Sequence, residues 1–257
     1  MNLFAAIGRV FLLFLRETGA LAVFAGDAVT GCIRPPLYWA LIGKQMMRIG
    51  YFSLPVVGLT AFFTGGVLAL QIYNGASRYG AETFVPVVVL VGITRELGPV
   101  IAGLMVAGRV AAAIAAEIGT MRVTEQIDAL TTLATNPIKY LVVPRLVAAV
   151  VSMPILVAIA DCIGVLGGYI ASTQGLGFNA HLYLSNTVDN VTYNDVSSGL
   201  IKAAVFGFII ALMGCYNGFR SKGGAQGVGA ATTTAVVSAS ILLLAANYIL
   251  TNLLFVK

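Results

Sequence analysis

Two charged residues, Arg95 and Glu96, stand side by side within a run of apolar residues. A charge at membrane depth costs about 2.5–3.5 kcal/mol on insertion scales, and such residues mark a transport pathway or a binding site. Neighbouring residues of a helix point about 100° apart, so these two side chains cannot pair with each other. We expect Lys202, in the first turn of a later apolar segment, to be the partner of Glu96.

Gly98 and Pro99 follow the charged pair and predict a kink in the helix. Proline has no N–H, so the carbonyl of Arg95 loses its usual partner, and glycine loosens the helix further. We therefore expect Arg95, Glu96 and Lys202 to line a polar pocket that opens outward and meets a zwitterionic or anionic headgroup. The alternative is a structural ion network without a ligand.

The composition is that of a membrane protein, because 59% of the 257 residues are hydrophobic and 10% are charged. Soluble domains contain about 25% charged residues. Basic residues outnumber acidic ones by 15 to 10, but they stand at the ends of apolar runs, which argues against nucleic acid as a partner. The three cysteines are scattered, without the spacing of a disulfide framework or a metal site.

Apolar runs of spanning length predict an all-α integral membrane protein. Its five predicted spans cover residues 51–73, 84–119, 140–172, 199–217 and 228–255. The second would be roughly 50 Å long against a hydrocarbon core of about 30 Å, so its last turns should project into the cytosol. Two polar residues, Asp161 and Asn247, also fall within spans, and we expect Asn247 to hydrogen-bond between helices.

The residues before these spans read as interfacial. The first 25 residues predict an amphipathic helix lying in the interface plane. Residues 26–49 form a second interfacial piece, in which Arg34-Pro35-Pro36 breaks the helix and Trp39 stands beside basic residues. The chain thus divides into an N-terminal interfacial region, 1–49, and a transmembrane domain, 50–257.

Basic residues flanking the spans predict the orientation. The outer ends carry only Arg78, Lys202 and Lys257. The cytosolic ends carry Arg9, Arg16, Arg34, Lys44, Arg48, Arg122, Lys139, Arg145, Arg220 and Lys222. This bias places the N-terminus in the cytosol and, after five spans, the C-terminus outside.

Two connecting segments are open to two interpretations each. Residues 124–130, within a cytosolic segment of about 122–134, predict a short helix on which Ile127 and Leu130 share an apolar face. It could insert into a groove of a soluble partner, or it could be a capped loop helix. The outer loop, about 173–198, is either a docking surface or a solvated connector.

Small residues recur every four positions in two spans. The stripes are Gly103, Ala107, Ala111, Ala115 and Gly119 in the second span, and Ala160, Gly164, Gly168 and Ser172 in the third. Such stripes let helices approach closely in lipid. They predict either a seam between subunits or packing within one chain.

Catalytic motifs are missing from the sequence. Neither G-x-x-x-x-G-K-[ST] nor H-E-x-x-H occurs, and the lone His181 has no cluster of metal ligands around it. We therefore predict no catalytic residues, no metal and no cofactor. The chain is expected not to be an enzyme.

Three stretches resemble the MlaE/YrbE permease family, whose members are the membrane subunits of ABC transporters that work with MCE-domain lipid carriers. They are ITRELGPVIAGLMVAGR (93–109), AEIGTMRVTEQIDAL (116–130) and NPIKYLVVPR (136–145). The E-Q-I-x-A-L element is the most specific of them, and the resemblance covers about residues 50–257.

The resemblance implies a homodimer of five-span subunits, each holding a cytosolic ABC ATPase subunit, beneath a periplasmic MCE hexamer. A small cytosolic STAS-domain subunit is a further candidate partner. The resemblance further implies a coupling helix that enters the ATPase groove and includes Glu125, Gln126, Ile127, Asp128, Ala129 and Leu130. It also implies that Arg95, Glu96 and Lys202 lie by a lipid pocket between the two copies, whereas Asn247 stands where some relatives carry an acidic residue.

We therefore expect a phospholipid transporter permease in a bacterial inner membrane, which maintains the lipid asymmetry of the outer membrane. One alternative is an ion-coupled secondary transporter that uses Arg95, Glu96 and Lys202. Five spans do not divide into two matched repeats, which weighs against it. An intramembrane hydrolase is a second alternative, but it would need a nucleophile with a base.

Overall fold

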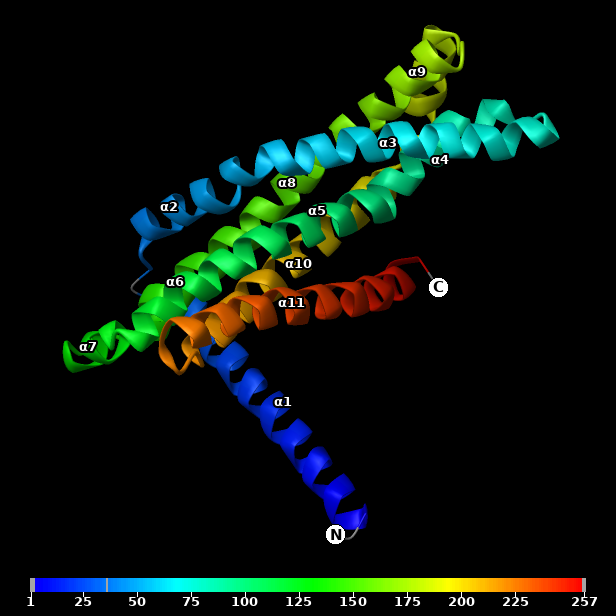
Figure 1. Ribbon diagram of the computed structural model, residues 1–257. Coiled ribbons are helices and arrows are strands. Elements are labelled where there is room, and N and C mark those ends of the chain that lie inside the picture. The colour runs from blue at the N-terminus through cyan, green and yellow to red at the C-terminus, as the bar shows by residue number, and fades with distance from the viewer. Residues whose placement is uncertain (1–2, 36, 256–257) are drawn as a thin grey trace.

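The computed structural model describes residues 3–35 and 37–255, and within these ranges the chain is helical and forms no strand (Figure 1). The predicted all-α membrane fold with five spans is confirmed. Helical stretches long and apolar enough to cross a membrane cover Trp39–Tyr79, Glu82–Val123, Ile138–Gly175, Tyr193–Phe219 and Gly224–Phe255. Pro36 and Lys257, used above as a helix breaker and an outer charge, lie outside the described residues.

The N-terminal helix is longer than predicted. α1 (Leu3–Ile33) is one helix of 31 residues, and its far end lies well away from the five spans (Figure 1). It ends at the predicted break. The next helix, α2 (Trp39–Ile49), continues through a 3₁₀ turn, Tyr51–Ser53, into α3 (Leu54–Ala76). Residues 39–49 are therefore continuous with the first span, in one helical stretch from Trp39 to Tyr79, and their interfacial position stays a prediction.

The second span is interrupted twice by π-helical turns. α4 (Val85–Gly92), α5 (Gly98–Val106) and α6 (Ala112–Val123) are joined by η4 (Ile93–Leu97) and η5 (Ala107–Ala111). In η4 the N–H of Gly98 bonds to the Ile93 carbonyl, five residues back. The helix thus widens by one residue where Pro99 cannot donate. Such turns occur frequently at functional sites.

The third, fourth and fifth spans are α8 (Val143–Ile170), α10 (Tyr193–Phe219) and α11 (Gly224–Phe255). α8 is flanked by π turns over Ile138–Val142 and Ala171–Gly175. α7 (Gln126–Thr132) and α9 (Ala180–Asp189) lie at opposite ends of the molecule (Figure 1).

The predicted outer loop is largely helical. Asn179 caps α9 by accepting hydrogen bonds from the N–H groups of His181 and Leu182, and Tyr183 is buried against Tyr169 and Phe178. α10 begins at Tyr193, earlier than the residue 199 expected from hydropathy. Tyr193 and Asn194 are exposed, but the polar side chains of Asp195 and Ser198 in the first turns are buried in the protein, which hydropathy alone does not register.

Both small-residue stripes pack within the chain. A Cβ on Gly65 of α3 would lie 1.8 Å from the carbonyl oxygen of Gly164 in α8, so glycine is required there. Likewise the backbones of Ala111 and Ala115 lie against glycines of α10. These seams hold the spans together, whereas α11 keeps large apolar side chains exposed, namely Val237, Ile241, Leu244, Tyr248, Ile249 and Leu253.

Candidate functional site: an ion network at the break in the second span

The carboxylate of Glu96, in η4, is held by three side chains from two other helices. Its Oε1 accepts hydrogen bonds from Lys202 Nζ at 2.8 Å and from Thr251 Oγ1 at 3.0 Å. Its Oε2 accepts one from Asn247 Nδ2 at 2.9 Å. The predicted pairing with Lys202 is confirmed, as is the interhelical hydrogen bond of Asn247.

Lys202 is completely buried and uses all of its donors. Besides Glu96, its ammonium donates to Thr251 Oγ1 at 2.7 Å and to the main-chain carbonyl of Arg95 at 2.9 Å. That carbonyl is the one that Pro99 leaves without a helical partner. An ammonium has three N–H groups, so the charge at this depth is fully hydrogen-bonded.

Arg95 points away from Glu96 and has its own partner. Its Nε and Nη2 lie 2.6 and 2.5 Å from Oδ1 of Asp195, and its guanidinium lies 4.6 Å from the ring centre of Phe255. Asp195 was assigned to the outer loop and so was missed as a partner. Because Asp195 and Lys202 are seven residues apart, they share a face of α10, and this spacing could have revealed it. Thr251, four residues after Asn247, was missed although the same rule applies.

The four charges alternate and sum to zero. Lys202 and Asp195 are buried, whereas the side chains of Arg95 and Glu96 remain 37% and 38% exposed. The network therefore presents one guanidinium and one carboxylate, each backed by a buried countercharge. Such a dipolar surface suits binding of a zwitterionic group. Within the described residues no group of three or more His, Cys, Asp or Glu side chains could hold a metal.

Gly98 lets a further buried carboxyl approach this region. A Cβ on Gly98 would lie 1.9 Å from Oδ1 of Asp161, which α8 brings against η4. Asp161 is buried, as its place within a predicted span suggested, and among the described residues its Oδ1 has no hydrogen-bond partner. The predicted kink position is thus also a point of close approach between the second and third spans.

The element predicted to lie in the cytosol is helical as expected, but its apolar face is turned inward. Ile127 is buried in the core of this chain, and Leu130 packs against the same core. Because Ile127 is buried in its own chain, the structure favours the capped loop helix for this residue, and insertion of the element into a partner's groove stays a prediction. Arg122 pairs with Asp128 at 2.6 Å, Glu125 has a left-handed φ of 59°, and Leu133 is 75% exposed.

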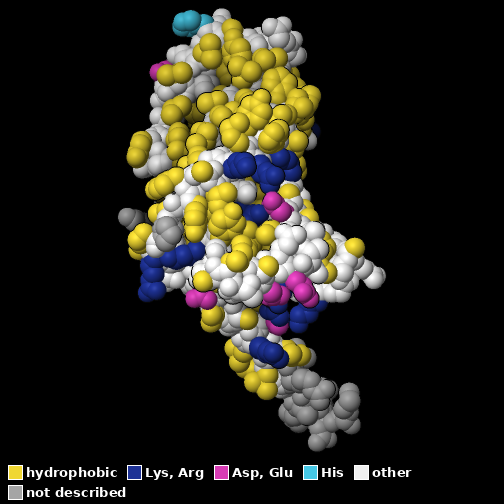
Figure 2. All heavy atoms as spheres, turned by 90° about the vertical axis from the view of Figure 1, so that its left-hand side faces the viewer, with side chains coloured by type: hydrophobic (Ala, Val, Ile, Leu, Met, Phe, Trp, Pro, Cys, Tyr) yellow, Lys and Arg dark blue, Asp and Glu magenta, His cyan; other side chains and the backbone are white. Residues whose placement is uncertain are grey.

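Basic side chains gather at the end of the molecule that carries α7 (Figure 2). There the guanidinium of Arg220 ties α1 to the end of α10 by bonding both carboxylate oxygens of Glu17, at 2.5 and 2.9 Å. The hydrogen bond from Arg220 lowers the pKa of Glu17 below its usual value. Lys202, counted above as an outer charge, is instead buried, so it does not weaken the bias.

Comparisons of the sequence with known proteins give matches over nearly the whole chain. A family profile described as Permease MlaE matches residues 42–253. A Rickettsia bellii protein named Probable ABC transporter permease protein is 55% identical over 255 residues, covering 99% of this chain and 98% of that protein. The Intermembrane phospholipid transport system permease protein MlaE of Haemophilus influenzae is 33% identical over 256 residues, with the same coverage. Protein TRIGALACTOSYLDIACYLGLYCEROL 1, chloroplastic, of Arabidopsis thaliana is 34% identical over 233 residues, covering 91% of this chain and 67% of that protein.

Proposed function

The chain belongs to the MlaE permease family, and from this premise we propose that it is the membrane subunit of an ATP-driven phospholipid transporter. It moves phospholipid between a bacterial inner membrane and a periplasmic MCE lipid carrier, and so maintains outer-membrane lipid asymmetry. The relative named for intermembrane phospholipid transport supports this assignment. The N-terminus lies in the cytosol and the C-terminus in the periplasm, in keeping with the basic end that carries α7.

The observation that carries the proposal is the ion network at η4. Arg95 offers a guanidinium to a lipid phosphate, Glu96 offers a carboxylate to a headgroup amine, and Lys202 and Asp195 hold both in place. The hydrogen bond from Lys202 to the Arg95 carbonyl holds the backbone of the π turn in place. A lipid headgroup leaving the bilayer would therefore meet a preformed polar surface.

The transporter contains two copies of this chain, and the pocket lies between them. The exposed apolar face of α11 lies beside the network, because Asn247 and Thr251 belong to that helix. Each copy carries one ABC ATPase subunit, which performs ATP hydrolysis, and an MCE assembly covers the periplasmic side. A STAS-domain subunit is a further partner on the cytosolic side. The permease chain itself catalyses no reaction.

Residues 125–130 transmit the ATPase cycle, together with the exposed Leu133. ATP binding draws the two α7 elements together, and the second spans carry the movement to the network. Moving an equilibrium decisively from one state to the other needs about 5.5 kcal/mol of differential interaction, which a nucleotide cycle can supply. Ile127 anchors this element to its own chain, and the exposed side chains of Glu125 and Asp128 offer charge to the partner.

Reconstitution tests the proposal. The complex of permease and ATPase in liposomes is expected to move fluorescent phospholipid to an MCE acceptor only with ATP, and replacing both Glu125 and Asp128 by alanine should uncouple lipid-stimulated hydrolysis. Intact partner binding and hydrolysis in that variant would contradict the coupling role. Transport driven by an ion gradient without the ATPase would instead favour the ion-coupled alternative, which membership of this family does not favour.

A further inference from the structure

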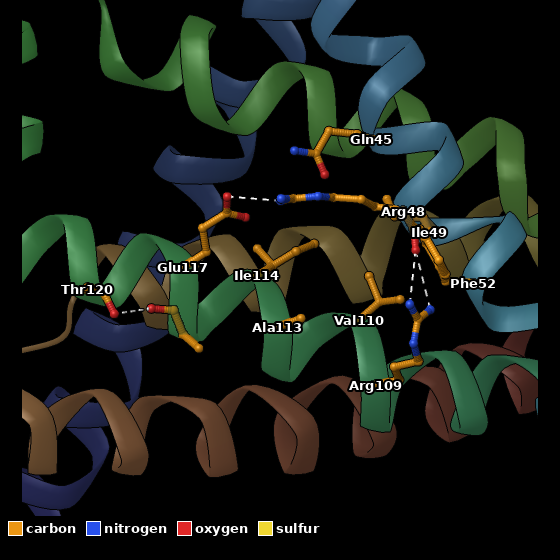
Figure 3. Close-up of a pocket in the computed structure, with 11 residues that line it drawn as sticks. Gln45, Arg48, Ile49, Phe52, Arg109, Val110, Ala113, Ile114, Glu117 and Thr120 are labelled. Carbon is orange, nitrogen blue, oxygen red and sulfur yellow. Dashed lines mark hydrogen bonds and ion pairs between the residues drawn. The ribbon is translucent and has the colours of Figure 1, made fainter.

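A cavity of about 640 Å³ opens between α2 and α6, near the end of the molecule that carries α7 (Figure 3). Its polar lining comes from Gln45, Arg48, Arg109, Glu117 and Thr120. Small and apolar residues of the second span form the rest of the lining on that side, namely Val110, Ala113, Ile114 and Ala116. None of these residues belongs to the ion network at η4.

The lining carries excess positive charge. Glu117 is the one carboxylate among the lining residues, and its two oxygens already accept from Arg48 at 3.1 Å and from the buried Arg145 at 2.9 Å. Arg109 donates to Ser53 Oγ at 2.6 Å and to the main-chain carbonyl of Arg48 at 3.3 Å. The cavity is thus lined by two guanidinium groups and one carboxylate, and the buried Arg145 behind Glu117 adds a third positive charge, which leaves a net charge favourable to an anion.

Part of the polar lining is unused by the protein. In the described part of the chain the Gln45 side chain makes no hydrogen bond, and Figure 3 shows it directed into the same space as the side chain of Arg48. Ala113 is exposed, so no large side chain fills the space over α6. A ligand with several acceptor oxygens would meet donors from two helices there.

Residue types typical of headgroup depth flank the cavity. Exposed Trp39, Tyr51 and Phe52 mark the membrane interface along α2 and the turn after it, and the Arg109 guanidinium lies 6.0 Å from the ring centre of Phe52. Exposed apolar side chains begin directly afterwards on α3, at Val56, Leu59, Phe63 and Val67. Acyl chains can lie along this strip while a headgroup occupies the cavity.

We propose that this cavity binds the phosphate of a phospholipid from the leaflet next to α7. Guanidinium groups match phosphate oxygens in geometry as well as charge. Arg109 and Arg95 are fourteen residues apart on the second span, roughly 21 Å along the helix axis, so this is a second lipid site, distinct from the network at η4. The proposal rests on the proposed phospholipid substrate, and it gives the transporter a lipid contact in the opposite leaflet.

Photo-crosslinking in the intact complex tests the site. The probe is the substitution Ala113→p-benzoylphenylalanine, in nanodiscs of phosphatidylethanolamine and phosphatidylglycerol. We expect phospholipid adducts by mass spectrometry. Arg48→Gln and Arg109→Gln should each reduce the adduct yield about tenfold, since each removes a charged hydrogen-bond donor. Lys44→Gln removes an exposed charge from α2, the helix of Arg48, at a position outside the cavity, and it should leave the adduct yield unchanged.

Three results would overturn the proposal. Adducts to a second copy of the chain would mean that another protomer covers the cavity. Loss of lipid adducts on adding inorganic phosphate would assign the site to a soluble phosphate. Equal yields in Arg48→Gln, Arg109→Gln and Lys44→Gln would mean unspecific contact with bulk lipid. Glu96→Gln separates this site from the proposed function: it should stop transport while adducts at position 113 persist.

Discussion

The ammonium of Lys202 lies 2.9 Å from the main-chain carbonyl oxygen of Arg95, the oxygen that Pro99 leaves without an N–H donor. The same nitrogen lies 2.8 Å from Glu96. The Lys202 side chain therefore supplies the hydrogen bond that the Arg95 carbonyl lacks within its own helix, and it also neutralises the Glu96 carboxylate. The break in the helix and the charged site are a single structural feature, and each depends on the other.

Replacing Lys202 by methionine should destabilise the protein strongly. The change leaves the Glu96 carboxylate and the Arg95 carbonyl without their donor. Removing one partner of a buried ion pair costs about 3–5 kcal/mol, and we expect about 3 kcal/mol here because the Glu96 side chain is partly exposed. Heat-induced loss of monodisperse protein in detergent measures the effect as a lower Tm. Ile201→Met, at an exposed neighbouring position, is the control and should keep the wild-type Tm.

A double substitution separates charge pairing from packing. With Glu96→Gln added, Lys202→Met no longer leaves a carboxylate unpaired, so the double variant should be more stable than the sum of the single changes predicts. Strict additivity in the measured Tm values would mean that the two side chains do not interact energetically.

Asp195→Asn should weaken lipid transport while sparing the fold. Its carboxylate accepts from both Nε and Nη2 of Arg95, so the neutral amide loses the charge that holds the guanidinium in place. We expect about a tenfold loss of ATP-driven lipid transfer, in keeping with the ~1.4 kcal/mol that corresponds to this factor. The matched control is Asp189→Asn, an exposed acid on α9. Equal transfer by the two variants would contradict the positioning role of Asp195.

Gly98→Ala should lower the thermal stability, because its Cβ would overlap Oδ1 of Asp161 and force the second and third spans apart. Overpacking of this kind costs about 1–3 kcal/mol. Gly108→Ala, in the same span, meets no atom within 4 Å and should be neutral or slightly stabilising. Comparison of the two Tm values tests the contact, and equal values would mean that α8 yields without cost.

Leu133→Gln should weaken binding of the ATPase subunit without unfolding the permease. The side chain is 75% exposed at the end of the element that contains α7, whereas Ile127 is committed to the core. Retention of the ATPase on the immobilised permease measures the effect, and we expect about a tenfold weaker complex. Leu182→Gln, an exposed leucine on α9 at the other end of the molecule, should retain the ATPase fully.

The attachment of α1 should loosen in acid. Hydrogen bonding to Arg220 lowers the pKa of Glu17 below its ordinary value of 4.5. The stabilising contribution of the pair is therefore complete above pH 4.5 and is lost as the pH falls through the lowered pKa. Spin labels are placed on cysteines introduced at Val23 and Lys222, in a variant without the native cysteines. The distance between them, measured by electron paramagnetic resonance, should lengthen only in strong acid. Glu17→Gln should remove this pH dependence; an unchanged acid response would contradict the assignment.

Much of the architecture follows from the sequence alone. A segment that crosses the bilayer core must pair its backbone groups internally, so it forms a helix, and the thickness of the core sets the length of its apolar run. The five spans were therefore predictable from apolar length. The pairing of Glu96 with Lys202 was predictable for a similar reason, since an intramembrane charge needs a partner and few candidates exist. The motif around Glu125 was sufficient to indicate the family.

Only the tertiary structure decided which faces meet. Hydropathy placed Asp195 in solvent, but the packing of α10 against η4 buries it beside Arg95. The apolar face of α7 could equally have met a partner or its own chain, and the tertiary packing buries Ile127 in its own chain. The cavity beside Arg48 and Arg109 joins residues 61 positions apart, a distance at which local periodicity carries no information. Spacing along one helix determines a face, whereas the partner of that face depends on how all the helices pack.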